Sequence, residues 1–194
     1  FINHHVVRNS PSSREKAKMV AVLSKSVFAL SWSGHVFASD VESRSCVLKF
    51  SAVSELSGVE IVWLSGTSEH CFAVCSDGRV FGRGSNDSGK LGFSKETSSV
   101  PSFTEIWSLS SHKIRAAYAG CNHSLFETRD GKILACGFNY HNELLLSCSP
   151  SNCVYSPTEI TITGGATFCI AGQRISAVFI GGEPPPNMPN RPVQ

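Results

Sequence analysis

The chain has 194 residues, enough for a normal hydrophobic core, and 41% of them are hydrophobic while only 16% are charged. Its 17 basic and 15 acidic residues leave a formal net charge of +2, which argues against a strong general attraction to nucleic acid or to acidic membranes. No apolar run approaches the roughly 20 residues that span a bilayer, so we expect no membrane partner.

The eight cysteines include no C-x₂-C pair of the kind that indicates a zinc site. They are Cys46, Cys71, Cys75, Cys121, Cys136, Cys148, Cys153 and Cys169. Cys71 and Cys75 share one face of an expected strand, as small buried apolar residues do. We therefore expect free structural thiols, with disulfides as the alternative, and an intracellular location, either cytoplasmic or nuclear.

Residues 1–18 are expected to form a basic N-terminal extension. Its Arg8 and Arg14 could contact the phosphates of nucleic acid or chromatin without reading the base sequence. Glu15 interrupts the positive run, so a solvated tail is the interpretation we favour. Because the chain starts at Phe1 rather than at Met, we expect it to be a piece of a longer protein.

Residues 19–182 are expected to contain short strands joined by tight turns. The first hairpin covers residues 26–40, and the clearest one joins the apolar runs 70–76 and 79–83 through Ser-Asp-Gly. Asp-Gly and Ser-Gly supply the positive φ that a tight hairpin turn requires. A further apolar run comes before each of the later hairpins, at 59–64 and 113–118, and another follows, at 103–109 and 158–163.

The loop after the second hairpin has the spacing of a phosphate-binding loop, with Gly84, Gly89 and Lys90 as G-x-x-x-x-G-K. Such a loop needs a Ser or Thr after the Lys to hold Mg²⁺, and it leads into a helix. Leu91 occupies that position, and a loop-like run ending at Pro101 follows. We therefore interpret the glycines as architectural.

A repeat supports this interpretation, because the stretch from His70 recurs 53 residues later from His123. The matching pairs are His70 with His123, Asp77-Gly78 with Asp130-Gly131, Gly84 with Gly137, Asn86 with Asn139, and Leu91 with Leu144. The second copy has Asn142-Glu143 in place of Gly89-Lys90, so the repeat does not preserve phosphate chemistry. Four strands in each unit of about 50 residues are typical of one blade of a β-propeller.

The best copy, His-x₆-Asp-Gly-Arg-Val followed by Gly-x-Asn-x₂-Gly-x-Leu-Gly, resembles the repeat of the regulator of chromosome condensation family. The resemblance implies an all-β fold, a β-propeller with about three to four blades present, in a family whose propellers commonly have seven. A partial or open propeller follows, completed by a larger parent protein, which we favour, or by a second chain. Two positions depart from the pattern, because Arg83 and Cys136 stand where an aromatic residue is usual.

The expected structural signature of the repeat comprises His70, Asp77, Gly78, Gly84, Asn86, Gly89, Leu91, Gly92, His123, Asp130, Gly131, Gly137 and Asn139. We expect the repeated histidines to be hydrogen-bonded parts of the scaffold, because a residue present once per blade more often holds a blade than does chemistry. No nucleophile elbow and no H-E-x-x-H motif occurs. We therefore predict no enzyme, no catalytic residue, no cofactor and no metal.

Residues 183–194 form a Pro-rich tail that favours extended polyproline geometry. Pro186, Pro189 and Arg191 fit P-x-x-P-x-R, a ligand pattern for Src-homology-type grooves. A linker between domains is far commoner for such a composition, so a linker is the interpretation we favour and a ligand is the alternative.

The function we predict is a non-catalytic protein–protein interaction module, part of a larger regulatory or signalling protein. Loops on a rigid rim would contact a protein partner. The resemblance also implies an alternative from another class, a guanine-nucleotide exchange factor for a small GTPase with chromatin association. No residue here matches a GTPase-contacting element, so exchange remains the second hypothesis.

Overall fold

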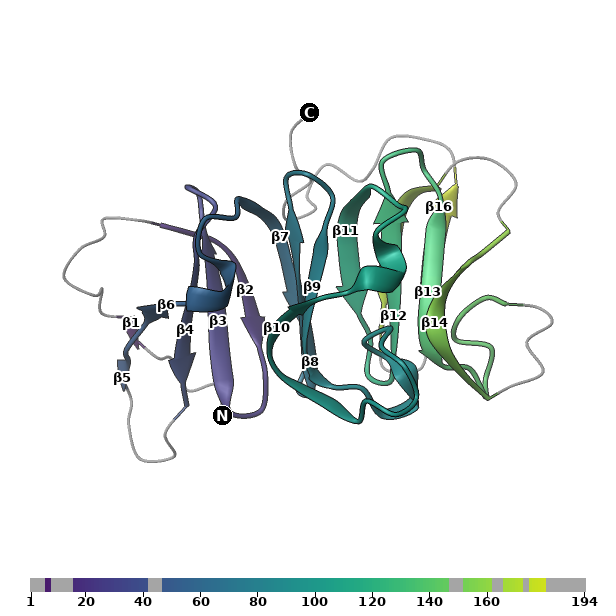
Figure 1. The fold of residues 1–194 in the computed structure, drawn as a ribbon, viewed down its shortest axis with the longest axis horizontal. Helices are drawn as coiled ribbons and strands as arrows, with labels where there is room; N and C mark the ends of the chain where they lie inside the picture. Colours follow the sequence, from purple (N-terminus) through teal and green to yellow (C-terminus); the bar gives the residue numbers. More distant parts are fainter. Residues whose placement is uncertain are drawn as a thin grey trace.

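The structure is a computed structural model that describes residues 6–7, 16–41, 47–146, 152–161, 166–172 and 175–180. Over these residues it contains strands and three short 3₁₀ turns, arranged as a row of twisted sheets that stand side by side like vanes (Figure 1). No helix in these ranges is long and apolar enough to cross a membrane.

Three sheets have four antiparallel strands each. The first contains β2 (Ala17–Val22), β3 (Ser26–Ser31), β4 (Val36–Asp40) and β6 (Ser51–Ala52). The second contains β7 (Ile61–Gly66), β8 (His70–Cys75), β9 (Val80–Ser85) and β10 (Ser99–Glu105). The third contains β11 (Ile114–Ala119), β12 (His123–Thr128), β13 (Ile133–Phe138) and β14 (Cys153–Glu159).

Two smaller sheets and three turns complete the described part. A fourth blade contributes the antiparallel pair β15 (Ala166–Ala171) and β16 (Ser176–Ile180), and β1 (Val6–Val7) pairs in parallel with β5 (Val47–Leu48). The 3₁₀ turns are η1 (Ser54–Leu56), η2 (Asp87–Gly89) and η3 (Trp107–Leu109).

Each four-stranded sheet follows the order of the chain, and consecutive sheets meet through their first strands. β2 contacts β7, β7 contacts β11, and β11 contacts β15. This is the blade-by-blade arrangement of a propeller, and three four-stranded blades with part of a fourth agree with the number expected from the repeat. The expectation of an all-β, partial propeller is confirmed.

The hairpin turn between β8 and β9 shows why the Asp-Gly pairs recur. The N–H of Gly78 donates to the carbonyl oxygen of Cys75 at 3.0 Å, and the N–H of Arg79 donates to Asp77 Oδ1 at 3.0 Å. Asp77 is exposed and closes the turn through its own side chain, as Asp does in Asx turns. The turn therefore fixes the register of β8 against β9.

The hydrophobic cores lie between the blades rather than within one sheet. Phe28 of the first blade meets Phe103 of the second edge-to-face, with 5.4 Å between ring centroids. Phe72 of the second blade meets Phe126 of the third in the same way at 5.2 Å. Burying one such side chain contributes about 2–3 kcal/mol, so the packed interior is formed at the junctions.

The outer strands differ from their predicted positions. The run predicted at 103–109 is β10 at Ser99–Glu105 followed by η3, and the run predicted at 158–163 is β14 at Cys153–Glu159. Both strands contain a proline, Pro101 or Pro157, and both lie at the edge of their sheet beside a bulge in the pairing. An edge strand tolerates proline because the missing N–H is not needed for pairing, so reading Pro101 as part of a loop was wrong.

Candidate functional site

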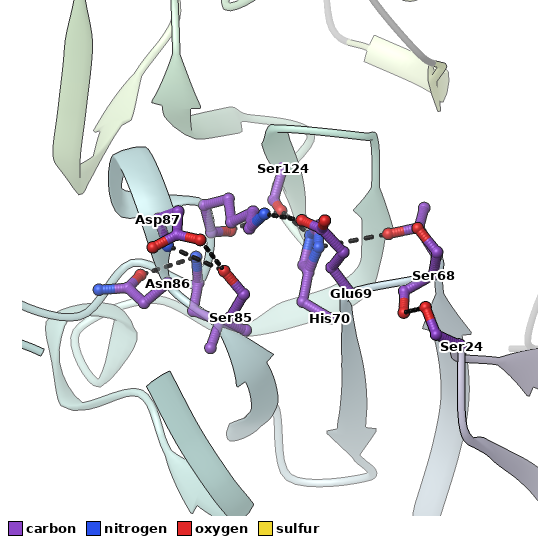
Figure 2. Close-up of polar contacts among 11 residues, drawn as sticks. Ser24, Ser68, Glu69, His70, Ser85, Asn86, Asp87 and Ser124 are labelled. Carbon is purple, nitrogen blue, oxygen red and sulfur yellow. Dashed lines mark hydrogen bonds and ion pairs between the residues drawn. The ribbon is translucent and has the colours of Figure 1, made fainter. Parts of the chain in front are cut away.

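The lysine of the apparent phosphate loop lies inside the protein. Lys90 is only 1% exposed, and its ammonium group forms an ion pair with the carboxylate of Glu69 in the same blade. Figure 2 shows Glu69 next to His70, at the end of the blade where β9 leads into η2. Because the charge of Lys90 is already neutralised by Glu69, the loop is not arranged to receive a phosphate.

His70 connects the second blade to the third. Its Nε2 lies 2.9 Å from Ser124 Oγ, and that hydroxyl donates its proton to the carbonyl oxygen of Lys90 at 2.7 Å (Figure 2). A serine hydroxyl has one proton to give, so His70 must donate through Nε2. Burial, with a smaller effect of the nearby Lys90 charge, lowers the pKa of His70 to about 3 and keeps the ring neutral.

The same contact recurs one blade later. His123 Nε2 lies 2.9 Å from Ser176 Oγ, and both side chains are buried. Burial lowers the pKa of His123 as well, while the Glu143 carboxylate acts in the opposite direction. Two successive junctions between blades thus contain the same neutral histidine–serine pair.

The first junction uses other groups. Ser26 occupies the histidine position and bonds to Asp40 at 2.9 Å within its own blade, while Cys71 occupies the serine position and is buried. A different contact joins the two blades, because the N–H and the hydroxyl of Ser24 both donate to the carbonyl oxygen of Ser68, at 2.8 and 2.7 Å (Figure 2). Both members of the histidine–serine pair are therefore replaced at this junction.

The repeated asparagines organise the loops that follow the third strands. Asn86 Oδ1 accepts the N–H of Leu91 at 3.0 Å, and Asn139 Oδ1 accepts the N–H of Leu144 at 3.0 Å. The amide nitrogen of Asn86 also donates to three loop carbonyls, the shortest at 2.7 Å from Thr97. Both leucines are fully buried, so each asparagine folds its loop over an apolar anchor.

Gly84 and Gly137 are required where β9 and β13 approach the preceding strand. Their φ values are +115° and +113°, in the region that favours glycine. A Cβ on Gly84 would lie 2.2 Å from the carbonyl oxygen of Glu69, and one on Gly137 would lie 2.5 Å from that of Asn122. No side chain fits at either position.

Gly89 and Gly92 lie against the next blade. A Cβ on Gly89 would come within 2.6 Å of the Cα of Tyr155, and one on Gly92 within 2.9 Å of the Pro157 ring. The loop from the second blade therefore rests directly on β14 of the third.

The hairpin turns between β3 and β4 and between β8 and β9 also reach the next blade. The carbonyl oxygen of Gly34 accepts the N–H of Ile61 at 3.0 Å, and that of Gly78 accepts the N–H of Ile114 at 3.2 Å. Gly131 holds the matching turn position in the third blade, with φ +83°. Its neighbour Asp130 is exposed, and a hydrogen bond from Thr128 lowers the pKa of its carboxyl.

We name this end of the blades the turn rim, defined by residues 32–35, 76–79 and 129–132 and by η3, which lies beside them. Ile106, immediately before η3, donates its N–H at 2.9 Å to the carbonyl oxygen of Val80, the residue after the β8–β9 turn. The turn rim carries Trp32, which is 69% exposed, and Trp107, which is 71% exposed.

Charged side chains of both signs lie on or beside the turn rim. Arg79 pairs with Asp77 at 2.8 Å and with Glu105 at 3.7 Å, and Lys132 pairs with Glu159 at 3.1 Å. The ammonium group of Lys18 lies 5.6 Å from the centroid of the Trp32 ring. The surface thus combines large aromatic side chains with balanced charge.

The structure brings together residues that the sequence interpretation treated separately. Ser124 was not recognised as the partner of His70, and Lys90 was considered only as a phosphate ligand. Glu69 and the two rim tryptophans were not singled out. The recurrence of a serine directly after His123, and again at Ser176, was the signal available for the junction.

Among the described residues, no group of three or more His, Cys, Asp and Glu side chains could hold a metal ion. The four buried cysteines there, Cys71, Cys75, Cys136 and Cys169, are free thiols. Burial raises the pKa of Cys71 to about 12, so its reactive thiolate form is suppressed at neutral pH. The tail motif of Pro186, Pro189 and Arg191 lies outside the described residues, as do Arg8 and Arg14.

Comparisons with known proteins point to one repeat type. Residues 77–126 match the profile of the regulator of chromosome condensation (RCC1) repeat. The chain is 33% identical over 93 residues to the mouse E3 ubiquitin-protein ligase HERC2, covering 46% of this chain and 2% of that protein. It is 31% identical over 114 residues to the Arabidopsis thaliana ultraviolet-B receptor UVR8, covering 58% of this chain and 25% of that protein.

The fold comparison agrees with the sequence comparison. The structure of Prp20p from Saccharomyces cerevisiae matches with a TM-score of 0.69 over 84% of this chain and 43% of that one. At 18% identity this likeness shows the fold alone. The chain thus spans a small part of its sequence relatives and less than half of this structural neighbour.

Proposed function

The chain carries repeats of the regulator of chromosome condensation (RCC1) type, and from that premise we propose that it is a non-catalytic protein-interaction module whose partner binds the turn rim. The observation that carries the proposal is the exposure of Trp32 at 69% and Trp107 at 71% on that rim. Tryptophan is strongly enriched among the residues that dominate protein–protein binding energy.

The polar chemistry of the rim supports a protein as the partner. Arg79 is shared between Asp77 and Glu105, and Lys132 is paired with Glu159. Paired charges of both signs offer a polyanion no concentrated positive field, whereas aromatic residues together with polar ones are typical of protein interfaces.

The other half of the proposal concerns the repeat signature, which we assign to holding blades together. His70, His123 and Asn86 direct their polar atoms into the scaffold rather than to solvent. Specificity would then come from the rim, with the module inside the cell as part of a larger regulatory protein. Mouse HERC2, of which this chain matches 2%, illustrates how small a share of a protein such repeats can be.

The test uses three forms of the protein: the wild type, a double tryptophan variant and a control variant. Each is used to capture binding proteins from the same cell extract, and the captured proteins are measured by quantitative mass spectrometry. Trp32→Ser combined with Trp107→Ser should reduce specifically captured proteins by about tenfold or more, since hot-spot residues contribute about 2 kcal/mol or more each. Tyr140→Ser is the matched control, because Tyr140 is 64% exposed but lies in the loop after β13.

Circular dichroism should show the same β spectrum for all three forms. Capture that the double variant leaves unchanged, or that Tyr140→Ser reduces equally, would contradict a binding role for the turn rim.

A second candidate, guanine-nucleotide exchange on a small GTPase, is supported by the fold likeness to Prp20p, whose structure was described with its binding to Gsp1p and histones. Its test is nucleotide release from a panel of small GTPases with the protein at sub-stoichiometric concentration. Accelerated release would favour exchange and overturn the non-catalytic assignment. Unchanged rates across the panel would argue against exchange.

A further inference from the structure

A small pocket lies in the turn rim, next to Trp107. Gly78 and Val80 line it from the β8–β9 turn, and Ile106 and Leu109 line it from the segment around η3. Val80, Ile106 and Leu109 are at most 2% exposed, so the base of the pocket is apolar. Its cavity volume of about 20 Å³ has room for roughly one or two water-sized groups. The pocket therefore admits the tip of a side chain but not an aromatic ring.

The polar part of the pocket wall offers hydrogen-bond donors. Arg79 and Glu105 line the pocket and pair with each other at 3.7 Å. Ser110, His112 and Lys113 line it as well, and within the part of the chain that the structure describes their side chains make no hydrogen bond or ion pair. The ammonium group of Lys113 has three donors and no acceptor, and Ser110 and His112 can each donate. A group that accepts hydrogen bonds therefore fits the free positions of this wall.

The charges beside the pocket favour an anionic acceptor. Asp77 and Glu105 share the guanidinium of Arg79, which leaves the ammonium group of Lys113 without a carboxylate partner among the described residues. A second cation lies beside it, because the N–H of Arg129 donates to the carbonyl oxygen of Lys113 at 2.8 Å. The guanidinium of Arg129 bonds only to a backbone carbonyl in the described residues, that of Ser76.

We propose that this pocket receives the carboxylate of an aspartate or glutamate side chain of the protein partner. The inference rests on the proposed binding role of the turn rim and adds the chemistry of the partner. The carboxylate accepts hydrogen bonds from Lys113 and Ser110, and an apolar residue beside it packs on the indole of Trp107. Trp107 lies between Ile106 and Leu109 in the chain and is 71% exposed, so a partner that covers its indole lies beside the pocket.

The size and charge of the pocket suit one carboxylate rather than a polyanion. The tip of an aspartate or glutamate side chain matches the small volume. A single carboxylate needs only the local donors of the wall, whereas a polyanion needs an extended positive field.

The probe is a library of short random peptides displayed on phage and selected on the immobilised 194-residue chain. Each peptide is fused to the coat protein through its C-terminus, so only side chains present a carboxylate. Selection on the wild type should enrich Asp and Glu beside an apolar residue. A selected peptide should bind about tenfold more weakly when its acidic residue is replaced by the matching amide, because charge-assisted hydrogen bonds are lost.

Charge reversal at the pocket gives the sharper result. Lys113→Glu should weaken the selected acidic peptide about tenfold or more, and selection on this variant should enrich Lys and Arg instead. Lys95→Glu is the matched control, because Lys95 is exposed in the loop after β9, at the end of the blade opposite the turn rim. Calorimetry measures each affinity, and circular dichroism checks the fold. If Lys113→Glu loses its β spectrum, Lys113→Gln replaces it.

Trp107→Ser separates this inference from the proposed function. Peptides that need Trp107 but show no excess of acidic residues, or that bind Lys113→Glu as they bind the wild type, would overturn the carboxylate site and leave the turn rim as a binding surface. Acidic peptides that need Lys113 but bind Trp107→Ser unchanged would support the site and contradict the role of Trp107. A selection that enriches no peptide would overturn the inference.

Discussion

At the scale of single residues, the polar members of the repeat bond to the scaffold instead of facing a ligand. His70 has both ring nitrogens near hydroxyl groups, with Ser124 Oγ at 2.9 Å and Thr67 Oγ1 at 3.3 Å. A neutral imidazole can donate at one nitrogen and accept at the other, which suits it to bridge two blades. Lys90 differs from a phosphate-binding lysine because Glu69 already neutralises it.

The buried His70 predicts an acid-sensitive fold. Its pKa is near 6.5 when unfolded and about 3 when folded, so its contribution is fully present above pH 6.5 and is lost as the pH falls toward 3. The expected loss is roughly 1.4 kcal/mol per pH unit in that window. Urea unfolding at pH 7, 6, 5 and 4 measures the slope.

The control separates His70 from the carboxylates that also titrate in this range. His70→Gln should be less stable at pH 7 and should show a shallower loss on acidification. His141→Gln should keep the wild-type slope, because His141 is exposed. Equal slopes for wild type and His70→Gln would contradict the assignment of a buried neutral ring.

At the scale of elements, hairpins and first strands could be predicted, and outer strands could not. Asp77-Gly78 marks the turn between β8 and β9 because the required backbone geometry is local. The position of β10 depends on its pairing with β9 and on an edge that tolerates Pro101, neither of which shows in local sequence. The pairing of Lys90 with Glu69 depends on the hairpin that folds residue 90 back beside residue 69.

The residues of the candidate site also separate into those that the sequence could predict and those that it could not. The repeat identified the histidines and asparagines, because recurrence at a fixed spacing is visible in sequence. It did not identify Trp32 and Trp107, since the two tryptophans occupy different positions in their repeats and both come to lie on the turn rim only in the folded blades.

The loop after β9 should be held by a single side chain. Asn86→Ala removes one accepted and three donated hydrogen bonds, and we expect a loss of about 2–4 kcal/mol because several buried backbone groups lose their partner. Hydrogen–deuterium exchange should show residues 86–98 losing protection first. Ser88→Ala is the control in the same loop, and faster exchange spread evenly over all blades would contradict a local role.

At the scale of the whole molecule, the blades form a series in which the second and third junctions share the same histidine–serine contact, while the first is joined by Ser24 and Ser68. Apolar pairs such as Phe72 with Phe126 supply most of the free energy, and the histidine–serine contacts set how one blade sits on the next. Holding the blades in this way leaves the turn rim exposed at one end of the first three blades. The proposed binding function depends on this rigidity, because a partner must meet tryptophans from two blades at once.

The most direct test is a double-mutant cycle across the second junction, with His70→Ala, Ser124→Ala and the combined variant measured by urea unfolding at pH 7. If His70 and Ser124 fasten the blades to each other, the single losses will not add, and the coupling energy will be about 1–2 kcal/mol, as for a buried hydrogen bond. Losses that add to within about 0.3 kcal/mol would show that the two residues act separately and would contradict the account.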